Sequence, residues 1–345
     1  MKWTVLSDNR NSERLRVLAD ASEQVRAGDG TSGISRLSTE HGLSILLETT
    51  NEREQCDARI NIAERGGVRR SQIEQRRILL DTGASGVFVR NAEVLGIDLS
   101  TVDYVFISHG HSDHAGGLRY FLEQNTKAKV IVSPDAISGK FYSKRNYLHS
   151  ITTVWPKSIK DRLITVEKTC EIADGLYIIA HIPQIHPMPK GNKHLFMEGA
   201  NGEYVNDDFR HELALYTDGF LFTGCAHSGL ENILAACPYP VNSVVGGFHL
   251  LDGQELPEQR EPSSSIERPS RDGSRQSQSE EELQALAKRL KENYPSTQFY
   301  TSHCTGDKVF EIMKGVMGEQ LQSFRCGTMN EMECVGLSEK PNRRI

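Results

Sequence analysis

Four side chains that can bind a metal ion lie within six residues, in the segment His109-Gly110-His111-Ser112-Asp113-His114. In an extended chain, side chains two positions apart point the same way, so His109, His111 and Asp113 can converge on one side. His114 comes where the chain turns toward a helix, and its side chain can project from a different direction. Imidazoles suit Zn, Fe, Mn or Ni, and the carboxylate adds a hard oxygen donor. The spacing therefore predicts a metal centre with enough ligands to start two adjacent sites.

This ligand cluster has a definite structural context. It follows the apolar run Val102–Ile107, which is typical of a strand, and it precedes Gly116-Gly117 and a helical pattern over Ala115–Glu123. A histidine-rich surface loop without a metal is the competing interpretation. That interpretation gives no reason for a strand before the cluster and a helix after it, so motif and context together favour the metal centre.

The rest of the chain alternates strand-like apolar runs with helical patterns. Strands are predicted at Leu43–Glu48, Ile78–Leu80, Lys129–Ser133, Leu176–Ile182, Val241–Val245 and Phe299–Thr301. Helices are predicted at Val87–Leu95, Glu282–Tyr294 and Val309–Met317. Asp218-Gly219 separates two further apolar runs and predicts a hairpin, because this dipeptide readily adopts the positive φ of a tight turn. Strands and helices mixed in this way indicate an α/β or α+β sandwich.

Composition and charge exclude several classes of protein. The net charge is -6 and the pI is near 6.1, which argues against binding nucleic acid through bulk charge. No apolar run approaches the roughly 18 residues of a membrane span, and the first residues lack a signal-peptide pattern. The seven cysteines are odd in number and widely spaced, which favours reduced thiols over a disulfide framework. We expect a cytoplasmic protein that acts on a small molecule, including a phosphorylated one, without nucleic acid or membrane as partner.

The length of 345 residues suits one large domain. Two stretches interrupt its apolar pattern: residues 49–77 are densely charged, and residues 252–281 combine prolines with many Ser, Glu, Arg and Gln. The second cannot bury enough surface to offset its ordering entropy. We therefore predict a single domain over residues 1–345 with exposed insertions at 49–77 and 252–281. The sequence makes no prediction for the oligomeric state.

The His-x-His-x-Asp-His pattern after a strand resembles the signature of the metallo-β-lactamase superfamily. The resemblance extends from about Leu43 to Gly306. It implies an α+β fold, an αβ/βα four-layer sandwich with two sheets inside and helices outside, and one or two metal ions at the sheet edges. Asp81-Thr82-Gly83 resembles the first motif of the superfamily, whose aspartate supports the ligands rather than binding metal.

The resemblance also directs attention to later strand ends, where the superfamily supplies its remaining ligands. His227, His249 and His303 stand at such ends. Phe222-Thr223-Gly224-Cys225 is similar to a Phe-Thr-Gly-Asp segment, with Cys225 in place of the bridging aspartate. Cys225 then binds as a thiolate, or water alone bridges the metals.

The ligand set expected from this resemblance divides into two groups. His109, His111 and His227 bind one metal, and Asp113, His114 and His303 bind the other. His211 is an alternative to His227 as third ligand, and His249 either binds metal or meets the substrate. Asp113 and His249 are the expected catalytic residues. The cofactors are two divalent metal ions, for which Zn fits best and Mn or Fe are alternatives. The remaining histidines are expected in core or loop roles: His41, His149, His181, His186 and His194.

A narrower resemblance rests on the combination of several segments. They are residues 40–44, 91–98, 224–229 (Gly-Cys-Ala-His-Ser-Gly), 246–250 (Gly-Gly-Phe-His-Leu) and 303–306 (His-Cys-Thr-Gly). Together they are similar to the branch of the superfamily named after 7,8-dihydropterin-6-methyl-4-(β-D-ribofuranosyl)-aminobenzene-5′-phosphate synthase. The name implies a pterin-coupling reaction.

Two enzymatic interpretations use this same metal site. In a hydrolase, metal-activated hydroxide attacks a phosphoester, lactone or similar bond. In a dihydropterin-coupling synthase, a transferase, the same metals hold a phosphate leaving group. A metal-binding protein without catalysis is a third hypothesis, because fold does not imply function.

Two other classes of enzyme fit the sequence less well. Di-iron members of the superfamily carry a carboxylate at the position of His111, so oxygen and nitric oxide chemistry is disfavoured. Asp81-Thr82-Gly83 is also the motif of aspartic proteases, which need two such aspartates sharing a proton. Only one Asp-Thr-Gly occurs here, and that interpretation leaves the histidine cluster unexplained.

Overall fold

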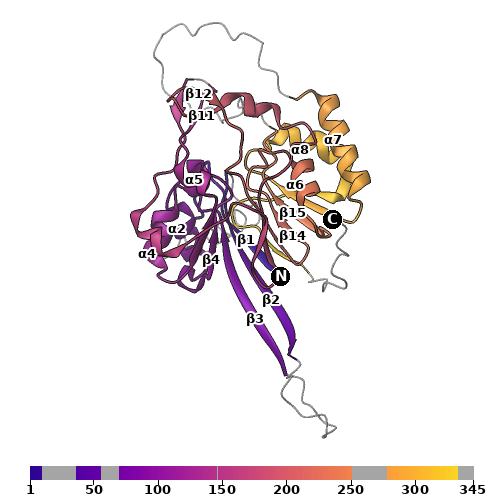
Figure 1. Cartoon of the computed structure of the whole chain (residues 1–345). Coiled ribbons are helices and arrows are strands. Elements are labelled where there is room, and N and C mark those ends of the chain that lie inside the picture. The colour runs from indigo at the N-terminus through magenta and orange to yellow at the C-terminus, as the bar shows by residue number, and fades with distance from the viewer. Residues whose placement is uncertain (10–35, 56–69, 146, 251–277, 333–345) are drawn as a thin grey trace, which may run out of the picture.

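The computed structural model describes residues 1–9, 36–55, 70–145, 147–250 and 278–332. The middle parts of both expected insertions, residues 56–69 and 251–277, lie outside the described residues. Two large sheets lie face to face, each with helices on its outer side (Figure 1).

The first large sheet comes mainly from the N-terminal half. Its strands, in spatial order, are β18 (Met329–Glu331), β1 (Lys2–Ser7), β2 (Ser44–Gln55), β3 (Arg70–Leu80), β4 (Tyr104–Phe106), β5 (Lys129–Val132) and β8 (Leu163–Thr165). The strands from β18 to β3 pair antiparallel, whereas β3, β4, β5 and β8 run parallel. This parallel half points its carboxyl ends to one edge, where ligand sites of such sheets usually form.

The second large sheet has a similar division. Its strands, in order, are β17 (Leu321–Ser323), β16 (Gln298–Thr301), β15 (Ser243–Gly246), β14 (Phe220–Phe222), β13 (Ala214–Thr217), β10 (Leu176–Ile179) and β9 (Cys170–Ala173). From β14 to β17 the neighbours are parallel. The hairpin predicted at Asp218-Gly219 is confirmed, because β13 and β14 pair antiparallel around these two residues, with φ of 46° and 81°.

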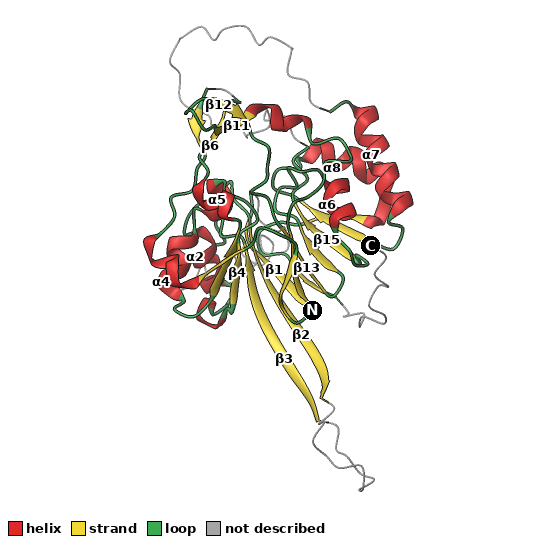
Figure 2. Ribbon diagram, in the orientation of Figure 1, coloured by secondary structure: helices red, strands yellow, loops and turns green. Residues whose placement is uncertain are grey.

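Three apolar clusters fill the spaces between the layers. The cluster between the sheets joins Ile45, Leu80 and Phe106 of one sheet to Leu215 and Phe222 of the other. A second cluster lies between the second sheet and three helices, α6 (Leu230–Ala236), α7 (Glu280–Asn293) and α8 (Asp307–Met317). A third lies between the first sheet and α2 (Val87–Val94), α4 (Leu118–Gln124) and α5 (Pro134–Ser138). The order helix, sheet, sheet, helix confirms the predicted α+β four-layer sandwich (Figure 2).

A third, small sheet stands apart from the sandwich. It consists of β12 (Tyr204–Asn206), β11 (Leu195–Glu198), β6 (Phe141–Ser143) and β7 (His149–Ser150), and lies near α5 in Figure 1. The sequence did not predict this sheet, because strands of two to four residues show too little alternation to stand out.

The boundaries of several elements differ from those predicted. The charged residues at both ends of the first expected insertion are paired strand residues, since β2 extends to Gln55 and β3 begins at Arg70. Helix α7 begins at Glu280, two residues before the predicted start. A capping box explains this start, because Ser279 accepts a hydrogen bond from the backbone N–H of Glu282, whose carboxylate accepts one from that of Ser279.

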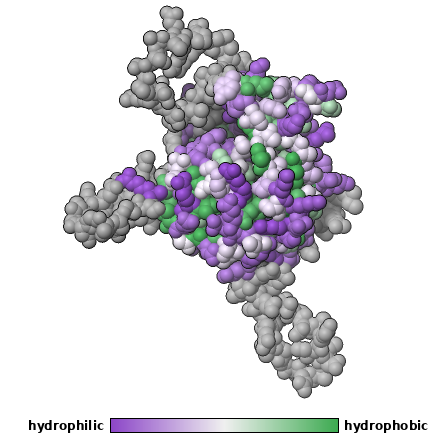
Figure 3. Space-filling view, turned by 90° about the vertical axis from the view of Figure 1, so that its left-hand side faces the viewer, coloured by the Kyte–Doolittle hydropathy of each residue, from purple (hydrophilic) through white to green (hydrophobic). Residues whose placement is uncertain are grey.

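The surface has exposed apolar residues, but they are dispersed. On the face that carries α2 and α4, apolar residues are scattered among hydrophilic ones (Figure 3). Tyr147 and Val154 are 70% and 91% exposed, and single exposed apolar side chains are ordinary on a protein surface. Within the described part of the chain, each helix is too short or too polar to cross a bilayer.

We expect Gly117→Ala to destabilise the fold by about 1–3 kcal/mol, because overpacking a tight contact forces the backbone to shift. Gly117 precedes α4, and a Cβ atom there would overlap the carbonyl oxygen of Thr82 and lie 2.6 Å from that of Ser85. Urea unfolding measures the change in the free energy of unfolding.

Gly315→Ala is the matched control, because Gly315 lies inside α8 and a Cβ atom added there would meet nothing within 4 Å among the described residues. Alanine there should stabilise the protein by about 0.5–1 kcal/mol through helix propensity. Changes of opposite sign in the free energy of unfolding of the two variants support the close packing of Gly117. A Gly117→Ala protein with an unchanged free energy of unfolding would contradict it.

Candidate metal centre

The residues with metal-binding side chains gather at the carboxyl ends of parallel strands from both large sheets. Asp81 follows β3, His109 to His114 follow β4, Cys225 and His227 follow β14, His249 follows β15, and His303 follows β16. Several of these turns use left-handed backbone, with φ of 55° at Asp81, 47° at His249 and 52° at His303. Such conformations cost about 1–3 kcal/mol and cluster at functional sites.

The first predicted ligand group is His109, His111 and His227. Their ring centroids lie 4.6 to 5.0 Å apart, and one ligand atom from each lies within 4.8 Å of the others. All three residues are buried. No described residue gives a hydrogen-bond partner to their Nε2 atoms. Three buried, unpartnered nitrogens that converge in this way are what a bound cation would satisfy.

Electrostatics favour the neutral, metal-binding form of these imidazoles. Burial, reinforced by the neighbouring imidazoles, holds the pKa of His109 and of His227 well below the usual value. Burial also lowers the pKa of His111, although Asp207 opposes this shift. Neutral imidazole is the form that ligates a metal ion.

The second predicted group, Asp113, His114 and His303, also converges. The Oδ2 atom of Asp113 lies 3.4 Å from Nε2 of His303 and 3.7 Å from Nε2 of His114. The two histidine Nε2 atoms are 3.2 Å apart. Burial would raise the pKa of Asp113, but the neighbouring imidazoles hold it well below its usual range. Burial would likewise lower the pKa of His303, but the hydrogen bond with Asp113 raises it to about 9. Asp113 therefore favours the protonated form of His303, and a metal ion bound there would replace that proton.

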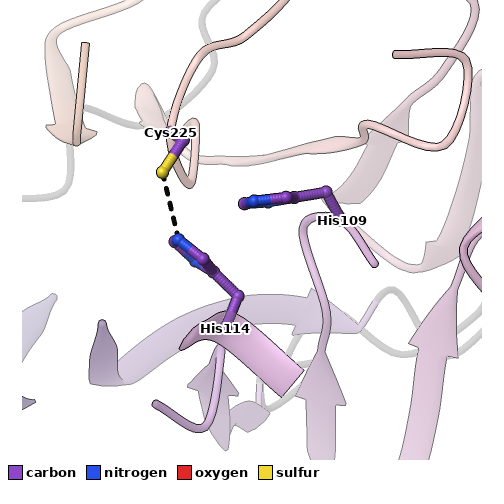
Figure 4. A group of neighbouring side chains, drawn as sticks. All are labelled: His109, His114 and Cys225. Carbon is purple, nitrogen blue, oxygen red and sulfur yellow. Dashed lines mark hydrogen bonds between the residues drawn. The ribbon is translucent and has the colours of Figure 1, made fainter. Parts of the chain in front are cut away.

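Cys225 lies between the two groups. Its Sγ atom is 3.0 Å from Nε2 of His114, and His109 points toward the same space (Figure 4). Ligand atoms of Cys225, His227 and His249 also lie within 4.8 Å of one another. Gly224 allows this approach, because it has a φ of 58° and a Cβ atom there would overlap Oγ of Ser108. Cys225 thus lies between the two predicted ligand groups, and burial raises the pKa of its thiol.

Asp81 orients ligands of both groups. It is fully buried, and its carboxylate accepts hydrogen bonds from the backbone N–H and the hydroxyl of Ser108, both at 2.7 Å. Its Oδ2 atom also lies 2.6 Å from Nδ1 of His114, while the Ser108 hydroxyl contacts Nδ1 of His109 at 2.8 Å. These contacts direct the Nε2 atoms of both rings into the site. They agree with the supporting role predicted for Asp81, and its complete burial does not suit an aspartic-protease dyad.

A second set of supporting contacts holds His227. Glu212, which is buried, accepts the backbone N–H groups of His227 and Ser228 at 2.7 and 2.6 Å. Oδ1 of Asn192 lies 3.2 Å from Nδ1 of His227, which leaves Nε2 facing the site. Burial raises the pKa of Glu212 to about 7. The sequence patterns did not reveal these partners, because Asn192 lies 35 residues before His227 and nothing local marks either polar side chain.

His211 has a different environment from His227. Its Nδ1 atom accepts the backbone N–H of Gly110 at 3.1 Å, and its Nε2 atom lies 3.1 Å from Oδ2 of Asp207. Both ring nitrogens therefore have partners, and His227 is the better third member of the first group. Oδ2 of Asp207 also lies 3.7 Å from Nε2 of His111, which is beyond hydrogen-bond distance, so Asp207 positions His211 and leaves that Nε2 atom without a partner among the described residues.

Two side chains near the site have contacts that the sequence patterns did not predict. His41, expected in a core or loop role, stacks on His303 and places Nε2 3.4 Å from Oδ2 of Asp113. Cys304 directly follows His303, and alternation along a strand would point the two side chains to opposite sides. Ligand atoms of Cys225, His303 and Cys304 instead lie within 4.8 Å of one another. The left-handed turn at His303 breaks the alternation.

A cavity of about 350 Å³ opens above both groups. His111, Asp113, Cys225, His227 and His303 reach its surface, and its other walls include Arg145, His149 and Ile151. Its volume lies within the range of small-molecule sites. The ligand clusters are therefore accessible to a compound of moderate size.

Comparison with known proteins shows which proteins this chain is similar to. The model of the Metallo-beta-lactamase superfamily matches residues 70–188, which include the His109–His114 segment. A solved structure described as a metal-dependent hydrolase of the beta-lactamase superfamily aligns with a TM-score of 0.63 and 24% identity. The alignment covers 96% of this chain and 99% of that one. The chain is therefore similar to the metallo-β-lactamase superfamily in the segment that carries its histidine motif, and it shares the fold of that solved structure.

Two curated relatives come from Methanocaldococcus jannaschii. One is an uncharacterised protein, 29% identical over 184 residues, an alignment that covers 52% of this chain and 70% of the relative. The other is named 7,8-dihydropterin-6-methyl-4-(beta-D-ribofuranosyl)-aminobenzene-5'-phosphate synthase. It is 25% identical over 235 residues, covering 62% of this chain and 72% of the relative. The similarity to this second protein agrees with the branch indicated by the sequence motifs.

Proposed function

We propose that this protein is a metal-dependent hydrolase that cleaves a phosphoester, lactone or similar bond in a small molecule. One observation carries the proposal. The unpartnered Nε2 atoms of His109, His111 and His227 converge at the base of the cavity, beside the Asp113, His114 and His303 group. Preformed ligand groups in an accessible cavity are what a catalytic metal site requires.

The donor set suits two divalent cations. His109, His111 and His227 would hold one, and Asp113, His114 and His303 the other, with Cys225 between them. Imidazole and thiolate donors favour Zn, whereas an all-nitrogen and oxygen set would accept Mn or Fe as well. A thiolate at Cys225 therefore makes Zn the preferred metal.

Cations bound in such a site lower the pKa of water from about 15.7 to near 7 and neutralise negative charge on the substrate. The side chains supply the rest of the chemistry. The carboxylate of Asp113 borders the cavity, where it can accept a hydrogen bond from the attacking water and orient it. Nδ1 of His249 has no partner among the described residues and is placed to meet the substrate. Asp81 and Asn192 keep the imidazoles of His114 and His227 in position.

A substrate panel tests the hydrolase proposal. Metal-loaded protein would be incubated with phosphomonoesters, phosphodiesters, lactones and thioesters, with and without a chelator. The proposal expects hydrolysis in at least one class, and loss of that hydrolysis with the chelator. Metal-loaded protein that hydrolyses no class would instead favour a metal-binding protein without catalysis.

A dihydropterin-coupling synthase is the second candidate, favoured by the similarity to the synthase of M. jannaschii. The same cations would hold the phosphate leaving group while the pterin side-chain carbon bonds to the aminobenzene partner. Mass analysis of products separates the two reactions. A coupled product from a pterin phosphate and the aminobenzene phosphate supports the synthase, whereas the pterin alcohol and free phosphate support the hydrolase.

Cobalt substitution should show whether Cys225 is a ligand. The Co(II) protein is expected to have a sulfur-to-metal charge-transfer absorption that Cys225→Ser removes, because only a coordinated thiolate produces it. Cys304→Ser is the matched control, since Cys304 is a buried cysteine of the same site and should leave the band in place. Loss of the band in Cys304→Ser, with the band retained in Cys225→Ser, would show that Cys304 is the thiolate ligand instead.

A further inference from the structure

The cavity wall contributed by the small sheet carries one arginine, Arg145. Arg145 follows β6, and its guanidinium Nη2 atom lies 3.1 Å from Nε2 of His249. The Nε atom of Arg145 is buried and has no hydrogen-bond partner among the described residues. A buried, unpartnered guanidinium N–H at a cavity wall indicates a missing acceptor.

The contact with Arg145 also determines the proton position on His249. A guanidinium group carries only donors and stays protonated in proteins, so Nε2 of His249 must accept the hydrogen bond. The proton of the neutral imidazole is then on Nδ1. That Nδ1 atom is buried and has no partner among the described residues. Arg145 and His249 therefore present two N–H donors that the described part of the protein does not use.

The charged side chains that line the cavity indicate that these donors would bind an anion. Of the described side chains that line the cavity, Asp113 is the one carboxylate, and it is assigned to the metal site. Arg145 remains as a positive charge without a carboxylate beside it in the described lining. The ring centroid of His249 is 4.1 Å from that of His227, so Arg145 and His249 lie next to the first ligand group. An anion held here would lie beside the reacting centre.

We propose that Arg145 and His249 form the subsite that binds a phosphate group of the substrate. The inference rests on the proposed function and narrows its substrate class from phosphoesters, lactones and similar compounds to phosphorylated ones. A phosphate has three terminal oxygens, so it can accept hydrogen bonds from the arginine fork and from the histidine N–H while another oxygen faces the metal site. A neutral lactone would leave the arginine charge without a partner.

Phosphate binding to the metal-loaded protein tests this subsite. Isothermal titration with inorganic phosphate should show that Arg145→Met weakens binding by about 10- to 100-fold, because hydrogen bonds to a charged group are lost. Arg145→Lys keeps the charge without the fork, and should recover part of the affinity. Lys144→Met is the matched control: it removes the same charge from the adjacent residue, which does not line the cavity, and should leave the affinity within about twofold.

Kinetics with a phosphoester give the second readout. Arg145→Met should raise KM, while Lys144→Met should leave KM near that of the wild type. Equal phosphate affinity in Arg145→Met and Lys144→Met would overturn the subsite. Acetate binding as tightly as phosphate would overturn its assignment to phosphate.

These failures are distinct from failure of the proposed function. A protein that binds no metal, or hydrolyses no compound, refutes the hydrolase. A metal-loaded, active protein with unchanged phosphate affinity in Arg145→Met refutes only the Arg145 and His249 subsite.

Discussion

Replacing His111 with alanine should lower metal-dependent turnover by more than about 100-fold. Replacing a residue that only supports a metal ligand lowers metal affinity or activity by about 10- to 100-fold. Removing a ligand itself should therefore lower them further. His111 is 4% exposed, and its ligand atom converges with those of His109 and His227. Elemental mass spectrometry should show reduced metal in the variant, and turnover should fall with it.

His149→Ala is the control for His111→Ala. His149 lines the same cavity and is exposed, but its Nδ1 atom contacts only the backbone carbonyl of Tyr147 among the contacts described, and it belongs to neither ligand group. Its replacement should leave the metal content unchanged. If His111→Ala retained the metal content and turnover of His149→Ala, His111 would not be a ligand.

Replacing Asp81 should have the largest effect on stability. Asp81→Ala leaves three buried donors without an acceptor, from the backbone and hydroxyl of Ser108 and from Nδ1 of His114. Each unsatisfied group costs about 1–3 kcal/mol, and the left-handed backbone at this position adds about 1–2 kcal/mol for alanine. We expect a loss of about 4 kcal/mol or more in the free energy of unfolding, which urea titration of the metal-free protein can measure. The total free energy of unfolding of an ordinary domain is only about 5–15 kcal/mol.

Asp81→Asn separates the stability effect from the effect on the metal. Asparagine tolerates the φ of 55° and keeps one acceptor oxygen, so the fold should persist, while metal affinity should fall about 10- to 100-fold. Asp208→Ala serves as the control, because Asp208 is an exposed aspartate, and should change stability by less than about 0.5 kcal/mol. An Asp81→Ala protein as stable as Asp208→Ala would contradict the role given to this carboxylate.

Local patterns in the sequence were sufficient for most of the large elements. The apolar periodicity of Val87–Leu95 and Val309–Met317 predicted α2 and α8 to within a few residues, because each buries one face in a continuous core. The hairpin at Asp218-Gly219 followed from backbone preferences alone. By contrast, β1 was not predicted, since this short N-terminal segment gains its strand form by pairing with the distant β2 and β18.

The candidate site shows the same division between local and long-range information. The segment His109 to His114 was identified because its ligands are contiguous, whereas His227 and His303 were identified through the family resemblance, which implies further ligands at later strand ends. Arg145 and Asp207 were missed, because they reach the site through the small sheet and through contacts between distant segments. Cys304 reaches the same site as His303 because alternation of side chains holds in a strand and fails at the left-handed turn of His303.

The number of metal ions bound by the wild-type protein tests the central claim most directly. Elemental mass spectrometry would be performed on protein purified without added metal and again after loading with Zn, Mn or Fe. Two ligand groups with Cys225 between them predict about two equivalents of metal per chain, with Zn retained most strongly. Protein that holds none of these metals after loading would contradict the account, because the converging imidazoles would then have no cation to bind.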